Sequence, residues 1–168
     1  MELLKRITNY FIPEGFSGDD DEKRRITFLI WLGLIVGINY IVSLSLIKLI
    51  VPLTPFQMAM GAFGAFANIS GPFLLRRRLP YFWTAQWVLL GNIFCFGTLL
   101  PVMGGVTTTL GVWMCSFPLF ALILMDWKQS VVWGAISGSI ALAFAILERS
   151  GQFIPVNPFA VAAPIVSF

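Results

Sequence analysis

The sequence has 168 residues, of which 58% are hydrophobic and only 11% are charged, and it contains no histidine. Its mean hydropathy is +0.85. A soluble domain usually has about a quarter of its residues charged, so this composition excludes an ordinary soluble domain and favours a chain that lies in a bilayer. The net charge of +3 does not indicate nucleic-acid binding, because the basic residues cluster at the ends of apolar segments, where they set membrane topology.

Residues 1–25 form a charged, amphiphilic segment ahead of the first long apolar run. Their apolar residues recur at helical spacing with basic residues between them, which predicts a short helix lying on the membrane surface. The acidic residues 19–22 stand directly before a basic run, as expected for the start of a helix that then enters the membrane. We expect residues 26–168 to form a transmembrane helical domain.

The apolar runs predict an all-α, polytopic transmembrane helical bundle with five complete spans and the start of a sixth. The spans are expected at about 26–50, 56–75, 81–102, 110–125, 129–147 and, incomplete, 159–168. A helix rises about 1.5 Å per residue, so the last run covers roughly half of a ~30 Å hydrocarbon core. The simpler interpretation is that the protein continues past Phe168, and a re-entrant segment is the alternative. Pro118 is expected to kink the fourth span.

Small residues mark where these helices are expected to pack closely. Gly33 and Gly37 in the first span form a GxxxG pair, as do Gly134 and Gly138 in the fifth. Such pairs let two helix backbones approach each other. The second span, which contains Gly61, is rich in glycine and alanine, so we expect it to lie at the centre of the bundle.

Uncharged polar residues lie in the interior of the first and third predicted spans. Asn39 and Tyr40 occur in the first span, and Thr84, Gln86 and Asn92 in the third. Thr84, Gln86 and Asn92 can each form a hydrogen bond between helices, worth about 0.6 to 2 kcal/mol. Neither Asp nor Glu occurs within the interior of a predicted span, although proton-coupled transporters usually depend on one.

The distribution of positive charge predicts the orientation of the chain. The pair Arg24 and Arg25 precedes the first span, and Arg76–Arg78 follow the second. If the N-terminus lies inside, nine of the 11 Lys and Arg residues fall on the cytoplasmic side, all except Lys48 and Arg149. The positive-inside rule therefore places the N-terminus in the cytoplasm. Phosphate binding by the three consecutive arginines is the alternative to a topological role.

The sequence contains no recognisable catalytic, cofactor-binding or metal-binding site. Cys95 and Cys115 lie in neighbouring spans at similar depth and could meet, but two cysteines without histidine do not make a metal site. We interpret them as small apolar packing residues. The 16 phenylalanines and 6 tryptophans could line an apolar ligand pocket, or they could face lipid and the membrane interface.

Several short motifs in the second half form a recognisable series. They are Gly104-Gly105-Val106, Trp113, Pro118-Leu119, Trp133 and Leu147-Glu148-x-x-Gly151, followed by Phe153 and Pro155. With these residues, the chain resembles the six-helix membrane sensor module found before bacterial sensor histidine kinases and, in relatives, before diguanylate or nucleotide cyclases. Gly104 and Gly105 would then form a turn on the outer face of the membrane.

The resemblance implies a signal-input domain in the bacterial inner membrane, belonging to a two-component system. The kinase or cyclase part would lie outside these residues, a homodimer would form through that output domain, and the ligand stays open. A small transporter or channel subunit is the alternative function, although no internal repeat supports it. An integral membrane enzyme is the third hypothesis, and it lacks candidate acids, bases and metal ligands.

Overall fold

The computed structural model describes residues 2–12, 18–50, 52–100 and 109–151, and every regular element within them is an α-helix. The helices are α1 (Glu2–Phe11), α2 (Asp20–Ile50), α3 (Pro55–Arg76), α4 (Tyr81–Leu99), α5 (Thr109–Met114), α6 (Phe117–Leu124) and α7 (Trp127–Arg149). Of these, α2, α3, α4 and α7 are long and apolar enough to cross a membrane. The all-α prediction is confirmed. The incomplete span at 159–168 and the turn at Gly104 and Gly105 lie outside the described residues.

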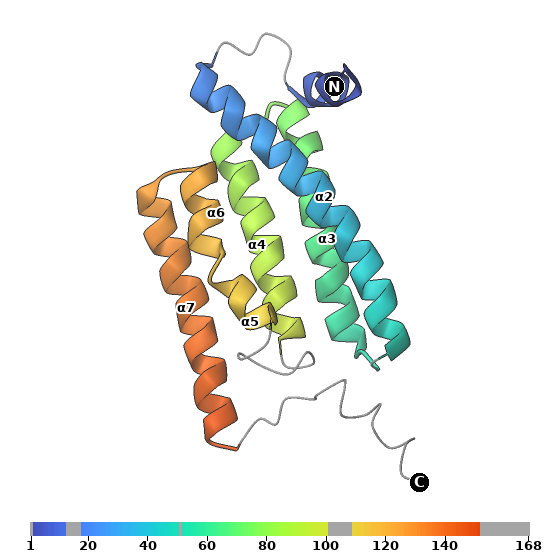
Figure 1. Cartoon of the computed structure of the whole chain (residues 1–168), viewed down its shortest axis with the longest axis vertical. Helices are drawn as coiled ribbons and strands as arrows, with labels where there is room; N and C mark the ends of the chain where they lie inside the picture. The colour runs from blue at the N-terminus through green and yellow to red at the C-terminus, as the bar shows by residue number, and fades with distance from the viewer. Residues whose placement is uncertain (1, 13–17, 51, 101–108, 152–168) are drawn as a thin grey trace.

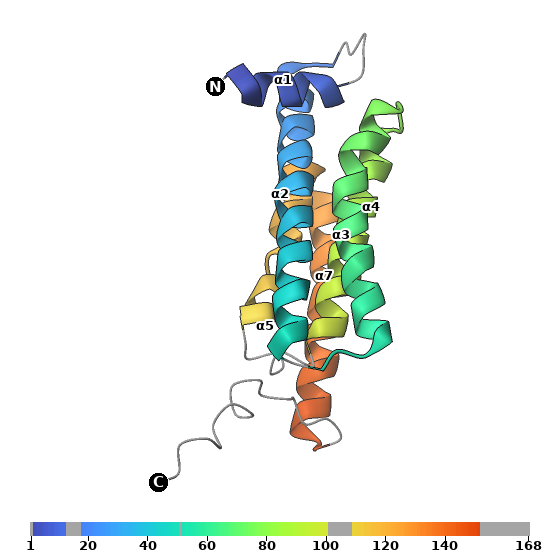
Figure 2. The same ribbon diagram turned by 90° about the vertical axis from the view of Figure 1, so that its right-hand side faces the viewer.

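The long helices run side by side along the length of the molecule, and α1 lies across one end of the bundle (Figures 1 and 2). The α3–α4 connection and the turn between α6 and α7 lie at the same end as α1 (Figure 1). That end therefore carries Arg24, Arg25, Arg76–Arg78 and Lys128, which are basic residues flanking the apolar helices.

Local capping explains where two of the long helices begin. The helix α2 begins at Asp20, earlier than the predicted apolar span at 26–50, because Asp19 Oδ1 accepts a hydrogen bond from the backbone N–H of Glu22 at 2.7 Å. The acidic run is thus the first turn of α2 itself, where it complements the helix dipole. Thr54 and Gln57 form a reciprocal capping box at the start of α3, with bonds of 3.2 and 2.8 Å.

The predicted fourth span is two short helices rather than one kinked helix. The break lies at Cys115 and Ser116, where α5 ends and α6 begins. Proline has no N–H to donate and its ring clashes with the carbonyl four residues earlier, so the interior of a regular helix is unfavourable for Pro118. It lies instead in the first turn of α6, where that N–H has no intrahelical partner anyway. The residues between Gly111 and Leu124 form the shorter apolar segment of the bundle.

The helices form two packing units. In the first, α3 lies between α2 and α4 and packs tightly on both. The second span was expected at the centre of the whole bundle, but α3 is central to this unit only, and α4 is the helix that also contacts α5 and α6. In the second, α6 packs on α7, and Ser130 Oγ donates to the backbone oxygen of Pro118 at 2.8 Å. Contacts between the units are sparser and are mostly apolar, with Phe117 of α6 completely buried between them.

Candidate functional site

A buried hydrogen-bond network joins the three helices of the first unit. Tyr40 of α2 donates its hydroxyl proton to Asn92 Oδ1 at 2.5 Å. Asn92 of α4 and Asn68 of α3 exchange side-chain hydrogen bonds, with Asn68 Nδ2 to Asn92 Oδ1 at 3.2 Å and Asn92 Nδ2 to Asn68 Oδ1 at 3.3 Å. All three residues are buried.

The two amides also donate to the backbone of their own helices, so both N–H groups of each amide have acceptors. Asn68 Nδ2 donates to the backbone oxygen of Gly64 at 2.8 Å, and Asn92 Nδ2 donates to that of Val88 at 2.7 Å. In the described part of the chain, every buried side-chain nitrogen and oxygen has a partner. Such a network fixes the register of α3 against α4, because a shift would leave polar groups unpaired in an apolar interior.

A small cavity of about 40 Å³ adjoins this network, at the boundary between the two packing units. Tyr40 and Asn92 supply its polar atoms, and aromatic and aliphatic side chains supply the remainder. These are Leu32, Val36, Leu89, Phe96, Trp113, Phe117 and Phe120. A cavity of this size holds about one water-sized group or slightly more. Several aromatic rings thus surround this cavity, whereas others, such as Phe66 and Trp83, are exposed on the outside of the bundle.

Phe96 is the central ring of the cavity wall. It stacks on Trp113 of α5, with ring centroids 6.4 Å apart and an interplanar angle of 7°. It meets Tyr40 and Phe117 edge to face, each at 5.8 Å. Since Trp113 and Phe117 stand on either side of the α5–α6 break, a change at this break would move two walls of the cavity.

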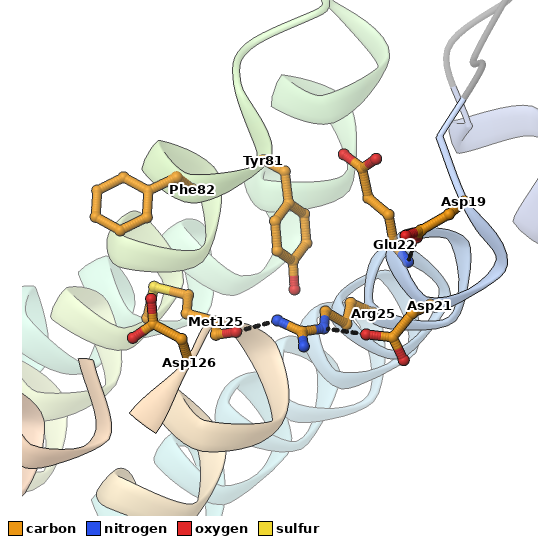
Figure 3. A pocket seen from close by; sticks show the side chains of 8 residues that line it. All are labelled: Asp19, Asp21, Glu22, Arg25, Tyr81, Phe82, Met125 and Asp126. Carbon is orange, nitrogen blue, oxygen red and sulfur yellow. Dashed lines mark hydrogen bonds and ion pairs between the residues drawn. The ribbon is translucent and has the colours of Figure 1, made fainter. Parts of the chain in front are cut away.

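A second pocket, of about 380 Å³, lies where the first turns of α2 and α4 meet the C-terminal end of α6 (Figure 3). The Arg25 guanidinium donates to the backbone oxygen of Met125 and pairs with Asp21 Oδ2 at 3.0 Å. Tyr81 donates its hydroxyl proton to the backbone oxygen of Leu124 at 2.5 Å. Both side chains thereby satisfy terminal carbonyl groups of α6, an arrangement that also suits the negative end of the helix dipole.

This second pocket is best explained as a structural anchor between the packing units. Four of its lining residues are acidic: Asp19, Asp21, Glu22 and Asp126. No group of three or more His, Cys, Asp or Glu in the described ranges could hold a metal ion. The sequence suggested Arg24 and Arg25 as topology markers. In the structure Arg25 also contacts the end of α6 through the backbone oxygen of Met125. The described contact of Arg24 is an exposed ion pair with Asp21 at 2.8 Å.

A polar contact also joins α4 to α7 in a wide groove. Gln86 Nε2 donates to Gln129 Oε1 at 2.7 Å, and Trp133 Nε1 donates to Gln86 Oε1 at 3.0 Å. The groove has a volume of about 480 Å³ and is otherwise lined by aromatic side chains and Leu90. Gln86 therefore makes the interhelical hydrogen bond that the sequence suggested for it.

The glycines singled out from the sequence differ in their surroundings. A Cβ added to Gly33 would lie 2.6 Å from the backbone oxygen of Asn68, and one on Gly37 would meet Ile69. Gly61 faces Leu44 of α2. A Cβ on Gly134 would meet only Pro118, at 3.5 Å, and one on Gly138 would meet no atom of the described residues within 4 Å. Of these five glycines, those with close approaches to another helix therefore lie between α2 and α3, and not on α7.

Two important positions were not identified from the sequence. Asn68 lies near the middle of the predicted second span, and an amide at that depth is itself a signal for a polar contact between helices. Gly91 lies where α4 crosses α3, so close that an added Cβ would collide with Ala67.

The three arginines that the sequence assigned to membrane topology, Arg76, Arg77 and Arg78, lie at the C-terminal end of α3. The described cysteines are free, with Cys95 buried and Cys115 exposed.

No protein-family model, curated protein or solved structure matches this chain.

Proposed function

We propose that this chain is a membrane-embedded signal-input domain of a bacterial sensor histidine kinase. It spans the inner membrane with its N-terminus in the cytoplasm, and the α5–α6 pair serves as one interrupted span. The proposal rests on the resemblance of the sequence motifs to sensor modules, and on the basic residues gathered at the end of the bundle that carries α1.

The observation that carries the proposal is the position of the cavity between two packing units. A ligand, or a change in the bilayer, that alters the packing of Phe96 against Trp113 and Phe117 would favour one placement of the α6–α7 unit over another. Because α7 is the last described helix, such a shift would be passed to the residues that follow it. A homodimeric kinase domain beyond α7 would convert the shift into a change of activity.

The first test is to determine the reading frame beyond residue 168. The proposal expects a further membrane segment and then a domain with a phosphoacceptor histidine and an ATP-binding region. A diguanylate or nucleotide cyclase domain would retain the input function and change the output. A frame without any output domain would contradict the proposal.

The second test compares two phenylalanines of α4 in the full-length protein in membrane vesicles. Phe96→Leu removes the ring in contact with Trp113, so we expect the basal autophosphorylation rate to change several-fold. Phe94→Leu is the matched control, since the Phe94 ring is half-exposed, contacts Phe63 of α3 and does not line the cavity, so its loss should leave the rate unchanged. Equal effects of the two substitutions would count against a signal acting through the cavity.

A small transporter or channel subunit is the second candidate, and the α5–α6 break favours it. Interrupted helices beside a cavity form the binding sites of many transporters. The chain reconstituted alone in liposomes would carry a solute if this alternative holds. The network of Tyr40, Asn68 and Asn92 argues against it, because each of these buried polar groups already has a hydrogen-bond partner within the bundle.

A further inference from the structure

A basic pocket of about 380 Å³ lies at the C-terminal end of α3, beside α1. Its lining residues are Asn9, Tyr10, Ile12, Arg76 and Arg78. Two guanidinium groups, an amide and a phenol are thus gathered around one hollow. Guanidinium groups bind phosphate through paired, charge-assisted hydrogen bonds.

The positive charge of this pocket is not neutralised by carboxylates of the described residues. Neither Arg76 nor Arg78 forms an ion pair with a carboxylate of the described residues, whereas Arg6, Arg24 and Arg25 do. The Arg76 guanidinium lies 3.6 Å from the centroid of the Tyr10 ring, a cation–π contact that holds it at the pocket wall. The site therefore presents two cations that are available to an anionic ligand.

Arg78 occupies a backbone conformation that normally favours glycine. Its φ is +63°, and the N–H groups of Arg78 and Leu79 donate to the backbone oxygens of Leu75 and Leu74 at 2.9 and 3.1 Å. These bonds form a Schellman motif in which Arg78 takes the left-handed position where glycine is most common. An arginine there costs stability relative to glycine, which is consistent with selection for its side chain.

The pocket also lies at the level of lipid headgroups if the bundle spans a bilayer. The apolar helix α3 ends at Arg76, and α1 lies across the end of the bundle (Figure 2). Ile7 and Phe11 of α1 pack against the core of the bundle, and the Phe11 ring is buried 5.1 Å from that of Phe73. An amphipathic helix in this orientation is typical of the membrane interface.

We propose that this pocket binds the phosphate group of an anionic phospholipid. The guanidinium groups of Arg76 and Arg78 bind the phosphate oxygens, and the Asn9 amide supplies a further donor. This inference depends on the membrane placement of the bundle and not on its role in signalling, so the two can fail separately.

The test compares three arginine substitutions in the full chain, reconstituted in nanodiscs of phosphatidylcholine with a minor fraction of phosphatidylglycerol. Arg76→Gln and Arg78→Gln remove a lining charge. Arg77→Gln is the matched control, because it removes the same charge from the same turn at a side chain outside the pocket lining. We expect each lining variant to retain about fivefold less phosphatidylglycerol in native mass spectrometry, and the control to resemble the unmodified protein.

A further variant separates binding from folding. Glycine adopts the left-handed backbone conformation of residue 78 without strain, so the melting temperature of the Arg78→Gly variant should equal or exceed that of the unmodified protein. Its retention of phosphatidylglycerol should fall as in Arg78→Gln.

Equal losses of phosphatidylglycerol in all three glutamine variants would show that only the general surface potential matters, and would overturn the proposal. Binding of inorganic phosphate with the same dependence on Arg76 and Arg78, without phosphatidylglycerol retention, would overturn the assignment to a lipid.

Discussion

Asn68 and Asn92 face each other across the contact between α3 and α4, and each side-chain amide donates to the oxygen of the other. The pair is buried where the small residues of α3 allow α4 to approach most closely. The polar contact and the close packing depend on each other, because neither amide could reach its partner across a wider interface.

Replacing one member of this pair should cost more than replacing a polar residue on the outside of the bundle. Asn92→Leu leaves Tyr40 and Asn68 without their partner, so we expect a loss of about 1 to 2 kcal/mol in the free energy of unfolding. The loss in Asn68→Leu/Asn92→Leu should be smaller than the sum of the two single losses, because the residues share one network. Unfolding in detergent, followed by tryptophan fluorescence, measures these energies.

The control for that cycle is Asn39→Leu. Asn39 is exposed on α2, where its side chain accepts a hydrogen bond only from Ser43, at 3.2 Å. Its replacement should leave stability unchanged. Additive losses for the two buried amides would contradict a shared network.

Two glycines of α4 should respond oppositely to alanine. Gly91→Ala places a methyl group against Ala67, and overpacking of this kind costs about 1 to 3 kcal/mol. Gly97→Ala meets no atom within 4 Å, so it should be neutral or stabilise the helix by up to about 1 kcal/mol. Both changes have the same effect on helix propensity, so the difference in melting temperature reports packing alone. Equal melting temperatures of the two variants would show that the contact between α3 and α4 can widen at Gly91 without loss of stability.

The bounds of α3 could be predicted closely, because both of its ends have local causes. Thr54 and Pro55 begin it, and the arginines that follow the apolar run end it; the predicted span at 56–75 differs by one residue at each end. The apolar parts of α2, α4 and α7 were also located by composition. The acidic residues 19–22 were also predicted to start a helix, and Asp20, Asp21 and Glu22 form the first turn of α2 ahead of the predicted membrane span at 26–50.

The contacts between helices could not be predicted, because they depend on how each helix is rotated about its axis. The GxxxG pattern occurs in both α2 and α7, yet Gly33 meets the backbone of α3 while Gly138 meets no described atom. The pairing of Asn68 with Asn92 requires a particular register of two helices, which no local pattern specifies. The break before Pro118 was predicted only as a kink, since the sequence does not show where the helix begins again.

The contact of α2 and α4 with the end of α6 should depend on Arg25 and Tyr81. Tyr81→Phe removes the hydrogen bond to the backbone oxygen of Leu124, at a cost of about 0.5 to 1.5 kcal/mol. Arg25→Gln removes a cation from the C-terminal end of α6. We expect both variants to increase amide hydrogen exchange in the last turn of α6, while the exchange of α3 stays the same.

Arg24→Gln is the matched control for Arg25. Arg24 precedes Arg25 directly, and its side chain pairs with Asp21 at the exposed surface. Its loss should leave exchange in α6 unchanged, since surface ion pairs contribute little to stability. If the two arginine variants behaved alike, net charge at this end of the bundle would matter more than the contact with Met125.

Replacing Pro118 should show whether proline causes the break between α5 and α6. Pro118→Ala restores an N–H that can donate to the carbonyl of Met114 and removes the ring that clashes with it. We expect α5 and α6 to join into one helix, with slower hydrogen exchange at Cys115 and Ser116. Pro72→Ala is the control, because α3 is already continuous through Pro72 and its helical extent should not change.

Joining these helices would also move the walls of the cavity, because Trp113 and Phe117 lie on opposite sides of the break. The stacking of Trp113 on Phe96 should then be lost, which a shift in tryptophan emission would report in a variant that retains only Trp113. Unchanged exchange at Cys115 and Ser116 would mean that the packing of these rings against α4 maintains the break without the proline. In that case the cavity would be a cause of the interrupted helix and not its consequence.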